Sequence, residues 1–489
     1  MLDTYYFYIY NITYNKIERS FAMKKTKTIS ESKLSGRTWF NLCLFGLIGQ
    51  IAWNLENMYF NTFMYETVYE KGEVVSATLP YMSAIKWMVG LSAVTAVVTT
   101  FIMGNLSDKM NKRKVFISAG YLVWGVVTIA FGFITKENIG NLFNIEDPAK
   151  IVFITSASII AMDCIMTLIG STSNDSAFNA WVTDITTTKN RATAESVLAI
   201  LPIVAMLVVM LSAGMITSFG GGDIAKGYTI YFIALGLCVC LCGVIGLFSL
   251  KDSKNGERKP NANYWKDLFY GFRPSVIKEN SKLYIALAAV CIYSVAVQIF
   301  FPYLLIYLDH AFGIQVTDLL GLLTGPVIAI AVIVVLGVVA GIIGFGKLTD
   351  KLGKKNSILI ANALFVIGLI AVGFTHDKKY LLIGAIPLLA GYGLMGILLN
   401  STVRDYTPED KTGLFQGIRM IFFVLIPMLT GPAIGDAVCK QVSGATFFEN
   451  GIEKYEPCAE MFIAAGIVAI LSFIPIIVLR IKGIDKKED

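Results

Sequence analysis

Charged residues are scarce in this chain of 489 residues, at 16% of the total, against about 25% in soluble domains. Hydrophobic residues make up 55%, and the mean hydropathy is +0.65. These values exclude an ordinary soluble domain and predict an integral membrane protein. The net charge of +6 follows from where Lys and Arg fall along a membrane chain, so we expect no nucleic-acid partner.

Residues that usually hold metals or perform catalysis are also few. Histidine occurs twice, and none of the eight cysteines forms a metal-ligand spacing. Cys238, Cys240 and Cys242 are two residues apart on an expected helix, so they point in different directions. No set of nucleophile and base is evident. We therefore expect no enzyme activity, no metal site and no cofactor beyond a coupling cation.

A secretory signal pattern is missing from the N-terminus, where residues 1–37 are polar and basic. We interpret this segment as a cytoplasmic tail. The Tyr-rich opening up to Ala22 differs in composition from the rest of the chain, and Met23-Lys-Lys-Thr-Lys resembles an ordinary cytoplasmic start. Translation from Met1 and from Met23 both stay open.

Long apolar segments are what the chain has in abundance. Each is long enough to cross about 30 Å of hydrocarbon as a helix. Twelve are predicted, near residues 38–62, 79–104, 115–134, 151–181, 194–218, 228–250, 282–308, 322–345, 357–375, 380–401, 413–438 and 459–482. The fold class is therefore an all-α membrane protein with twelve transmembrane helices.

One motif occurs twice. Gly104-Asn-Leu-Ser-Asp108-Lys-Met-Asn-Lys112-Arg113-Lys114 returns 242 residues later as Gly346-Lys-Leu-Thr-Asp350-Lys-Leu-Gly353-Lys354-Lys355. Each copy suits a tight loop between membrane helices, because its glycine permits close packing and its aspartate can accept from free N–H groups of the next helix. The spacing predicts a chain of two related halves. The alternative is two coincidental basic loops.

A second repeat supports the duplication: Val182-Thr-Asp184-Ile-Thr186 matches Val403-Arg-Asp405-Tyr-Thr407, 221 residues apart. We divide the chain into an N-terminal tail (1–37), an N-terminal six-helix bundle (38–250), a cytoplasmic linker (251–281), a C-terminal six-helix bundle (282–482) and a C-terminal tail (483–489).

The distribution of basic residues predicts the orientation. Tails and loops on the side of the repeated motif carry 31 Lys and Arg, and the opposite loops carry 8. This asymmetry places both termini in the cytoplasm of a cell-membrane protein. His310 and His376 then lie on the outer face, which argues against a histidine proton relay and leaves coupling to carboxylates. Cys439 and Cys458 bracket the last outer loop, where a disulfide and two free thiols are both open.

The first predicted helix carries polar residues inside the membrane. Gln50, Asn54, Asn57 and Asn61 form one stripe at helical spacing. Glu56 lies about 120 degrees away at about 100 degrees per residue, so we expect it to face a neighbouring helix or the side of a cavity. Its alternative role is a structural ion pair with Lys86 of the second helix.

The fourth helix has the clearest candidate binding face, which comprises Ser156, Asp163, Thr167, Gly170 and Asn174. A second face nearer the cytoplasm carries Asp175 and Asn179. A carboxylate beside hydroxyl and amide groups can bind a proton or a small hard cation and accept hydrogen bonds from sugar hydroxyls. The alternative is a polar seam between helices.

The seventh helix carries an aromatic stripe of Tyr293, Phe300, Tyr303 and Tyr307, beside Gln298 and Pro302. Aromatic rings pack on the apolar faces of sugars, and Tyr adds a hydroxyl. Plain packing is the alternative. Pro302 could break the helix near a cavity.

Charges near the cytoplasmic ends of the helices are candidate gating residues. They comprise Asp184, Arg191 and Glu195 in the first half and Arg404, Asp405 and Arg419 in the second, together with Asp108, Arg113, Asp350 and Lys354 of the repeated motif. Ion pairs between the halves could close the inner mouth in one state and break in the other. A solvated face is the alternative for Arg191 and Arg404.

The repeated loop resembles the signature Gly-x-Leu-x-Asp-Arg-x-Gly-Arg-Lys of the major facilitator superfamily, with Asn111 replacing one Gly of the pattern in the first copy. Asn174-Asp-Ser-Ala-Phe-Asn179-Ala-Trp-Val-Thr-Asp184, Asn190-Arg191, Glu195 and Phe415-Gln-Gly-Ile-Arg419-Met resemble the glycoside-pentoside-hexuronide cation symporter branch, that of melibiose permease. The resemblance implies two pseudo-symmetric bundles, a midplane cavity and sugar uptake driven by sodium or protons. That branch has acids in its second helix, where this chain has Lys86, which counts against sodium.

These observations predict a monomeric secondary transporter in the lipid bilayer that moves a small polar solute, most simply a sugar or glycoside, by symport with H⁺ or Na⁺. Its expected substrate and cation residues are Asn54, Glu56, Asn57, Lys86, Asp163, Thr167, Asn174, Asp175, Tyr293, Tyr303 and Tyr307. A passive facilitator or a carrier of amphipathic lipids is the alternative within this fold. A membrane receptor that binds a solute without moving it is the alternative from another class.

Overall fold

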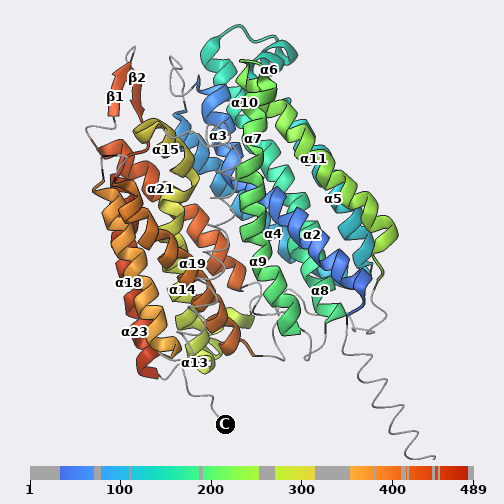
Figure 1. The fold of residues 1–489 in the computed structure, drawn as a ribbon, viewed down its shortest axis with the longest axis vertical. Helices are drawn as coiled ribbons and strands as arrows, with labels where there is room; N and C mark the ends of the chain where they lie inside the picture. Colours follow the sequence, from blue (N-terminus) through green and yellow to red (C-terminus); the bar gives the residue numbers. More distant parts are fainter. Residues whose placement is uncertain are drawn as a thin grey trace, which may run out of the picture.

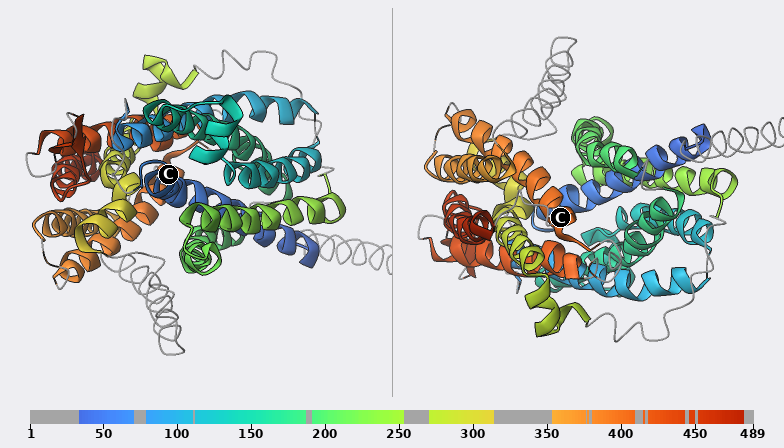
Figure 2. Two further views of the ribbon diagram at one scale, coloured as in Figure 1. Left: turned by 90° about the horizontal axis from the view of Figure 1, so that it is seen from above. Right: turned by 90° about the horizontal axis from the view of Figure 1, so that it is seen from below.

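The computed structural model describes residues 34–70, 79–110, 112–186, 191–252, 270–313, 353–375, 377, 380–408, 415, 418–442, 446–449 and 452–482. Helices dominate it, and they form two groups that lie side by side (Figures 1 and 2). Ten helices in this part of the chain are long and apolar enough to cross a membrane.

The first group lies between residues 34 and 252. It contains α2 (Gly36–Leu55), η1 (Glu56–Phe60), α3 (Asn61–Phe63), η2 (Met64–Val68), α4 (Tyr81–Met110), α5 (Arg113–Phe131), α6 (Lys136–Phe143), α7 (Pro148–Gly170), η4 (Ser171–Phe178), α8 (Asn179–Ile185), α9 (Arg191–Ser212), α10 (Gly214–Gly220) and α11 (Ile224–Ser249).

The second group begins at residue 270. It contains η5 (Tyr270–Phe272), α13 (Pro274–Glu279), α14 (Ser281–Phe300), η6 (Phe301–Tyr303), α15 (Leu304–Phe312), α18 (Lys354–Gly373), α19 (Leu381–Tyr406), η8 (Ile421–Leu425), α21 (Ile426–Gln441), β1 (Thr446–Glu449), β2 (Ile452–Tyr455), α22 (Glu460–Leu471) and α23 (Phe473–Lys482).

The predicted membrane segments agree with these helices. Eleven of the twelve coincide with helices of the described residues, and the segment 322–345 lies outside them. The prediction of an all-α protein missed one small feature, the antiparallel hairpin of β1 and β2, in which Thr446 pairs with Tyr455 and Glu449 with Ile452.

Local sequence explains where several helices begin. Ser35, Thr135, Asp147 and Asp223 each accept a hydrogen bond from a backbone N–H of the first turn, at 3.0 to 3.2 Å. Pro148 occupies the first position of α7, where a missing N–H has no cost. Gly353 precedes α18 with a φ of 76°, so the glycine of the second motif copy has a conformational role. Its counterpart Asn111 lies outside the described residues.

The helices pack closely inside each group and present apolar residues outward. A Cβ on Gly125 of α5 would lie 2.4 Å from the carbonyl oxygen of Gly236 in α11, so this pair of helices requires glycine there. Large apolar side chains such as Phe40, Trp87 and Phe248 are exposed around the outside. Exposure of this kind fits contact with lipid chains rather than water.

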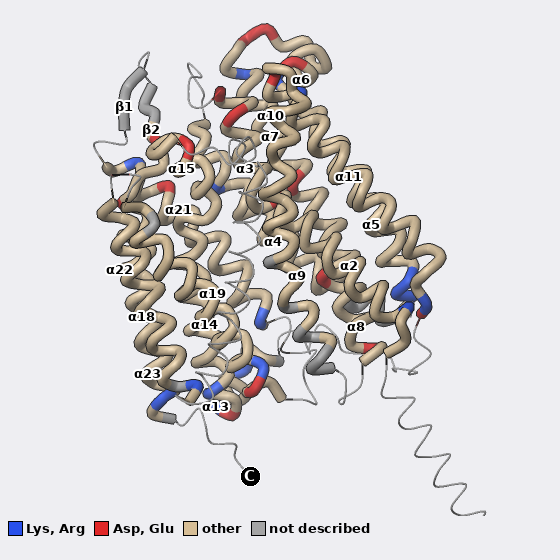
Figure 3. Tube along the Cα trace, viewed as in Figure 1, with Lys and Arg blue, Asp and Glu red and all other residues tan. Residues whose placement is uncertain are grey.

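The two ends of the molecule differ, and we name them by their contents. The hairpin end carries β1 and β2, and the basic end carries α13, the start of α5 and the end of α23 (Figure 1). Lys and Arg gather at the basic end, near α13, α23 and the start of α5 (Figure 3). This gathering matches the charge asymmetry from which the sequence predicts the orientation.

Candidate functional site

Two carboxylates meet inside the first helix group. Glu56 is the first residue of η1, where the helix of α2 widens into a π turn, and Asp163 lies in the middle of α7. Both are buried, with 7% and 2% of their surface exposed. Asp163 lies four residues before Thr167 on α7, so it shares a helix face with a hydroxyl that donates to Glu56. π turns of this kind recur at functional sites.

Hydroxyl groups from two further positions complete this site. Glu56 Oε1 accepts hydrogen bonds from Thr167 Oγ1 at 3.0 Å and from Ser92 Oγ at 3.2 Å. The two hydroxyls also contact each other at 2.5 Å. The site therefore draws on three membrane segments, those of α2 with η1, α4 and α7. We call Glu56, Ser92, Asp163 and Thr167 the carboxylate site.

Two oxygens of the carboxylate site lack a hydrogen-bond partner in the part of the chain that the structure describes. They are Glu56 Oε2 and Asp163 Oδ1, and both are buried. An unpaired buried oxygen costs about 1 to 3 kcal/mol, and more if it is charged. Such groups need a proton, a cation or a ligand to compensate them. Among the described residues, no group of three or more His, Cys, Asp and Glu side chains could hold a metal ion.

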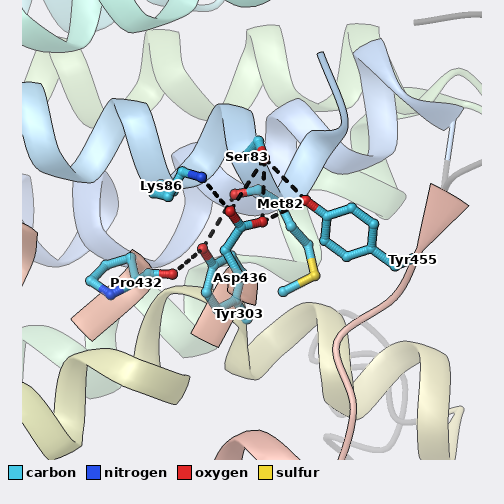
Figure 4. A network of polar contacts seen from close by, with 7 residues as sticks. All are labelled: Met82, Ser83, Lys86, Tyr303, Pro432, Asp436 and Tyr455. Atoms are coloured by element: carbon cyan, nitrogen blue, oxygen red, sulfur yellow. Dashed lines mark hydrogen bonds and ion pairs between the residues drawn. The ribbon is translucent and has the colours of Figure 1, made fainter. Parts of the chain in front are cut away.

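A second polar cluster joins the two helix groups at the hairpin end (Figure 4). Lys86 of α4 forms an ion pair with Asp436 of α21. Ser83 Oγ lies 3.3 Å from both carboxylate oxygens of Asp436 and 3.0 Å from the hydroxyl of Tyr455. Tyr455 in turn donates to Asp436 Oδ1 at 2.5 Å. The Asp436 carboxylate is therefore surrounded by donors from both halves of the chain.

Two more contacts cross between the groups nearby. Tyr81 of α4 donates to the carboxylate of Glu456. The hydroxyl of Tyr303 lies 3.2 Å from the carbonyl oxygens of Met82 and Pro432. We call the following residues the hairpin-end network: Tyr81, Met82, Ser83, Lys86, Tyr303, Pro432, Asp436, Tyr455 and Glu456.

Tyr455 is a reliable donor in this network. It lies in β2, outside the membrane-spanning segments, and is 3% exposed. Burial, with the hydrogen bond to Asp436, raises the pKa of its phenol above the usual value. The hydroxyl therefore stays protonated and continues to donate to the carboxylate.

At the basic end, ion pairs form within each half. Arg113 Nε lies 3.3 Å from Asp184 Oδ2 in the first half. Lys354 Nζ lies 2.5 Å from Asp405 Oδ2 in the second half and 2.8 Å from Ser401 Oγ. Each pair joins a basic residue of the repeated motif to the aspartate of the second repeat. The two basic residues differ by one position within the motif, because Arg113 aligns with Lys355 and not with Lys354. The two halves therefore resemble each other in these side-chain contacts as well as in sequence.

The matching family model is that of the Major Facilitator Superfamily, and it covers residues 38–344 and 330–488. The chain belongs to this superfamily. Its members are membrane transporters that carry solutes, so the chain is a transporter. Multidrug resistance protein 2 of Bacillus subtilis (strain 168) is 24% identical to it over 367 residues, which is 72% of this chain and 79% of the relative.

Solved structures of major facilitators share the fold. The xylose transporter XylE from E. coli, in a partially occluded inward-open conformation, matches with a TM-score of 0.61 and 13% identity, over 89% of this chain and 96% of that one. A mutant of the nucleoside transporter NupG matches with a TM-score of 0.60 and 10% identity, over 90% and 99%. At these identities the matches bear on the fold alone.

In this major facilitator, the polar stripe of the first helix is bound to its own backbone. The amide nitrogens of Asn54, Asn57 and Asn61 donate to the carbonyl oxygens four residues earlier, at 2.7 to 3.2 Å. Asn54 and Asn57 are half-buried, whereas Asn61 is buried. Their amide oxygens are the groups that a solute could reach at Asn54 and Asn57.

The polar face of the fourth helix lies between helices. Thr167 belongs to the carboxylate site, Ser156 Oγ donates to Tyr69 at 3.1 Å, and Asn174 donates to Tyr121 at 2.6 Å. Asp175 lies in η4 and accepts from Ser171 at 3.0 Å. These contacts have the form of the polar seam that the sequence left open as an alternative.

Lys86 does not pair with Glu56, so that alternative for Glu56 is wrong. Lys86 reaches Asp436 in the opposite half instead, and Glu56 faces Ser92 and Thr167. The expectation that Glu56 faces a neighbouring helix is confirmed. Our sequence reasoning did not single out Asp436, although an acid inside an apolar segment is a recognisable signal.

The tyrosines of the seventh helix are buried in packing and backbone contacts. Tyr293 donates to the carbonyl oxygen of Tyr392 at 2.7 Å. Tyr307 packs against Phe462, with ring centroids 5.1 Å apart. Pro302 does interrupt the helix, since α14 ends at Phe300 and the short helix η6 follows.

The remaining gating candidates fall into two groups. Arg419 donates to Asn400 Oδ1 at 2.9 Å and lies 4.8 Å from the ring centroid of Phe423, within the second half. The side chains of Asp108, Arg191 and Glu195, and the whole of Asp350, lie outside the described part. We expected ion pairs between the two halves at the inner mouth. Asp184 and Asp405 instead pair with Arg113 and Lys354, each within its own half.

Proposed function

We propose that this major facilitator is a secondary transporter that couples the movement of a small polar solute to a cation bound at the carboxylate site. The observation that carries the proposal is the pair of buried oxygens, Glu56 Oε2 and Asp163 Oδ1, which have no hydrogen-bond partner among the described residues. Two acids in one buried site that pair with no described basic residue favour the uptake of a positive charge. Either a proton or Na⁺ could supply this positive charge. A transport assay with an imposed proton gradient or an imposed Na⁺ gradient distinguishes the two.

The solute we favour is a sugar or glycoside. The support is the resemblance of residues 174–184 and 415–420 to the glycoside-pentoside-hexuronide cation symporter branch. The half-buried amides of Asn54 and Asn57 offer the polar groups that sugar hydroxyls bind. A carrier of amphipathic or drug-like molecules is the second candidate, and the similarity to Multidrug resistance protein 2 favours it.

The contacts between the halves support alternating access. At the hairpin end, the hairpin-end network holds the halves together, whereas the ion pairs Arg113–Asp184 and Lys354–Asp405 at the basic end stay within one half. If the basic end faces the cytoplasm, as the charge asymmetry predicts, this arrangement is closed toward the outside. Opening outward then requires the Lys86–Asp436 pair to separate.

The test has two steps. First, the melting temperature of the purified protein is measured with a panel of monosaccharides, disaccharides, aryl glycosides and lipophilic cations, because a ligand that binds only the folded state raises it. Second, the ligand found is followed into proteoliposomes under an imposed proton gradient or an imposed Na⁺ gradient. Accumulation driven by one gradient identifies the cation.

Variants connect the result to the site. Glu56→Gln and Asp163→Asn should abolish gradient-driven accumulation, while the matched control Glu66→Gln removes an acid of the same helical segment that binds Tyr228 instead. If both amide variants together accumulate solute as the wild type does, the coupling site is wrong. Uptake that equilibrates without accumulation under either gradient would show a passive facilitator.

A further inference from the structure

Two cysteine thiols lie in contact at the hairpin end. Cys439 is near the end of α21 and fully buried, and Cys458 lies between β2 and the start of α22, half-buried. Their sulfur atoms are 3.2 Å apart, and the backbone N–H of Cys458 lies 3.4 Å from Cys439 Sγ. The other six cysteines, Cys43, Cys164, Cys238, Cys240, Cys242 and Cys291, lie within the helices α2, α7, α11 and α14.

The segment enclosed by these two thiols contains part of the hairpin-end network. Tyr455 and Glu456 come shortly before Cys458, and Asp436 comes three residues before Cys439. Tyr455 contacts Asp436 and Ser83, and Glu456 accepts from Tyr81 of the opposite half. A covalent bond between the thiols would therefore hold the hairpin residues in position against Asp436.

We propose that Cys439 and Cys458 form a reversible disulfide that fixes the hairpin segment and stabilises the closed hairpin end. The bond lies within the second half, so it leaves the halves free to separate. It acts by preorganising Tyr455 and Glu456 for their partners on α4, which lowers the entropy cost of closing. This last effect rests on the alternating-access proposal, whereas formation of the bond does not.

The chemistry is thiol–disulfide exchange with a small-molecule disulfide as oxidant. The thiolate of Cys458, which is partly exposed, attacks one sulfur of the oxidant and releases the first small thiol, which leaves a mixed disulfide on Cys458. The thiolate of Cys439 then attacks Cys458 Sγ and releases the second small thiol. Two protons and two electrons pass from the cysteine pair to the oxidant. Disulfides persist outside the cell, where the charge asymmetry places the hairpin end.

Thiol counting on the intact purified protein tests the bond. After treatment with oxidised glutathione, the protein is denatured and modified with a maleimide of high mass. The wild type has eight cysteines and should lose two reactive thiols on oxidation and regain both with a reductant. A Cys439→Ala and Cys458→Ser double variant should lose none. A wild type that keeps all its thiols, or a double variant that loses two, would overturn the proposal.

Single variants test the order of attack and guard against misfolding. Cys458→Ser leaves the buried thiol in place and should show no loss on oxidation. Cys439→Ala should lose one thiol and gain one glutathione adduct on Cys458, detectable by mass spectrometry. An adduct on Cys439 in place of Cys458 would contradict the assigned order.

The stabilising effect needs its own readout. Oxidised wild type should melt at a higher temperature than the reduced form, and peptides covering residues 452–458 should exchange amide hydrogen more slowly. In the double variant, neither oxidised glutathione nor the reductant should change the melting temperature or the hydrogen exchange. If the bond forms and these two measurements do not move, the role in closing fails, and because no transport is measured, the proposed function is unaffected.

Discussion

Lys86 of α4 and Asp436 of α21 form an ion pair across the two halves of the chain. The side chains are 27% and 8% exposed, so the pair is partly shielded from water. Ser83 and Tyr455 bring further donors to the same carboxylate. Asp436 thus binds the ammonium group of Lys86 and the hydroxyl groups of Ser83 and Tyr455, and through Tyr455 it contacts the hairpin.

Removal of this ion pair should favour the state open at the hairpin end. Lys86→Met leaves a shielded carboxylate without its cation, at a cost of about 2 kcal/mol or more. Since 1.4 kcal/mol corresponds to about a tenfold change in an equilibrium constant, the ratio of closed to open molecules should fall about thirtyfold. Amide hydrogen exchange of peptides within residues 79–90 and 452–458 should accelerate. Lys150→Met at the same end removes an exposed lysine and should leave exchange unchanged; equal protection in both variants would contradict the idea.

Neutralising the carboxylate site should remove the response to the coupling cation without harming the fold. An amide in place of Glu56 or Asp163 still fills the space but binds no cation. We expect the melting temperature of the wild type to depend on Na⁺ concentration or on pH and the Glu56→Gln variant to lose that dependence. The readout is differential scanning fluorimetry across both series. A variant with an unchanged cation dependence would place the coupling ion elsewhere.

The two ion pairs at the basic end should differ in their contribution to stability. The Arg113–Asp184 pair is largely buried, with 5% and 14% exposed, whereas Asp405 of the Lys354–Asp405 pair is 59% exposed. Exposed pairs contribute about 0 to 1 kcal/mol, and loss of one partner of a buried pair costs about 3 to 5 kcal/mol. Asp184→Asn should therefore lower the melting temperature clearly more than Asp405→Asn. The reverse order would show that burial does not govern these pairs.

Gly125 should tolerate no side chain, because α5 and α11 approach each other there. A Cβ would lie 2.4 Å from the carbonyl oxygen of Gly236, and overpacking of this kind costs about 1 to 3 kcal/mol. Gly125→Ala should lower the melting temperature and the yield of folded protein. Gly393→Ala is the matched control, since nothing lies within 4 Å of its Cβ position and alanine favours a helix by about 1 kcal/mol.

The sequence allowed the faces of single helices to be predicted only where the helices are regular. Extrapolation at about 100 degrees per residue places Asn174 with Asp163 and Thr167 on one face. The structure widens the helix into π turns at η1, which begins at Glu56, and at η4, which begins at Ser171 and contains Asn174. A π turn holds more residues than an α turn, so the phase changes there, and no periodicity in the sequence signals it.

The sequence by itself determined the membrane class, the positions of eleven of the twelve predicted membrane segments, the repeated motifs and the basic asymmetry, because apolar length, repeated motifs and charge are local properties of the chain. Tertiary structure alone decided which groups meet: Lys86 with Asp436, Glu56 with Ser92 and Thr167, and Cys439 with Cys458. Such partners lie on different segments, up to 350 residues apart for Lys86 and Asp436. Spacing within one helix predicts the direction in which a side chain points, but it does not identify the residue that the side chain contacts.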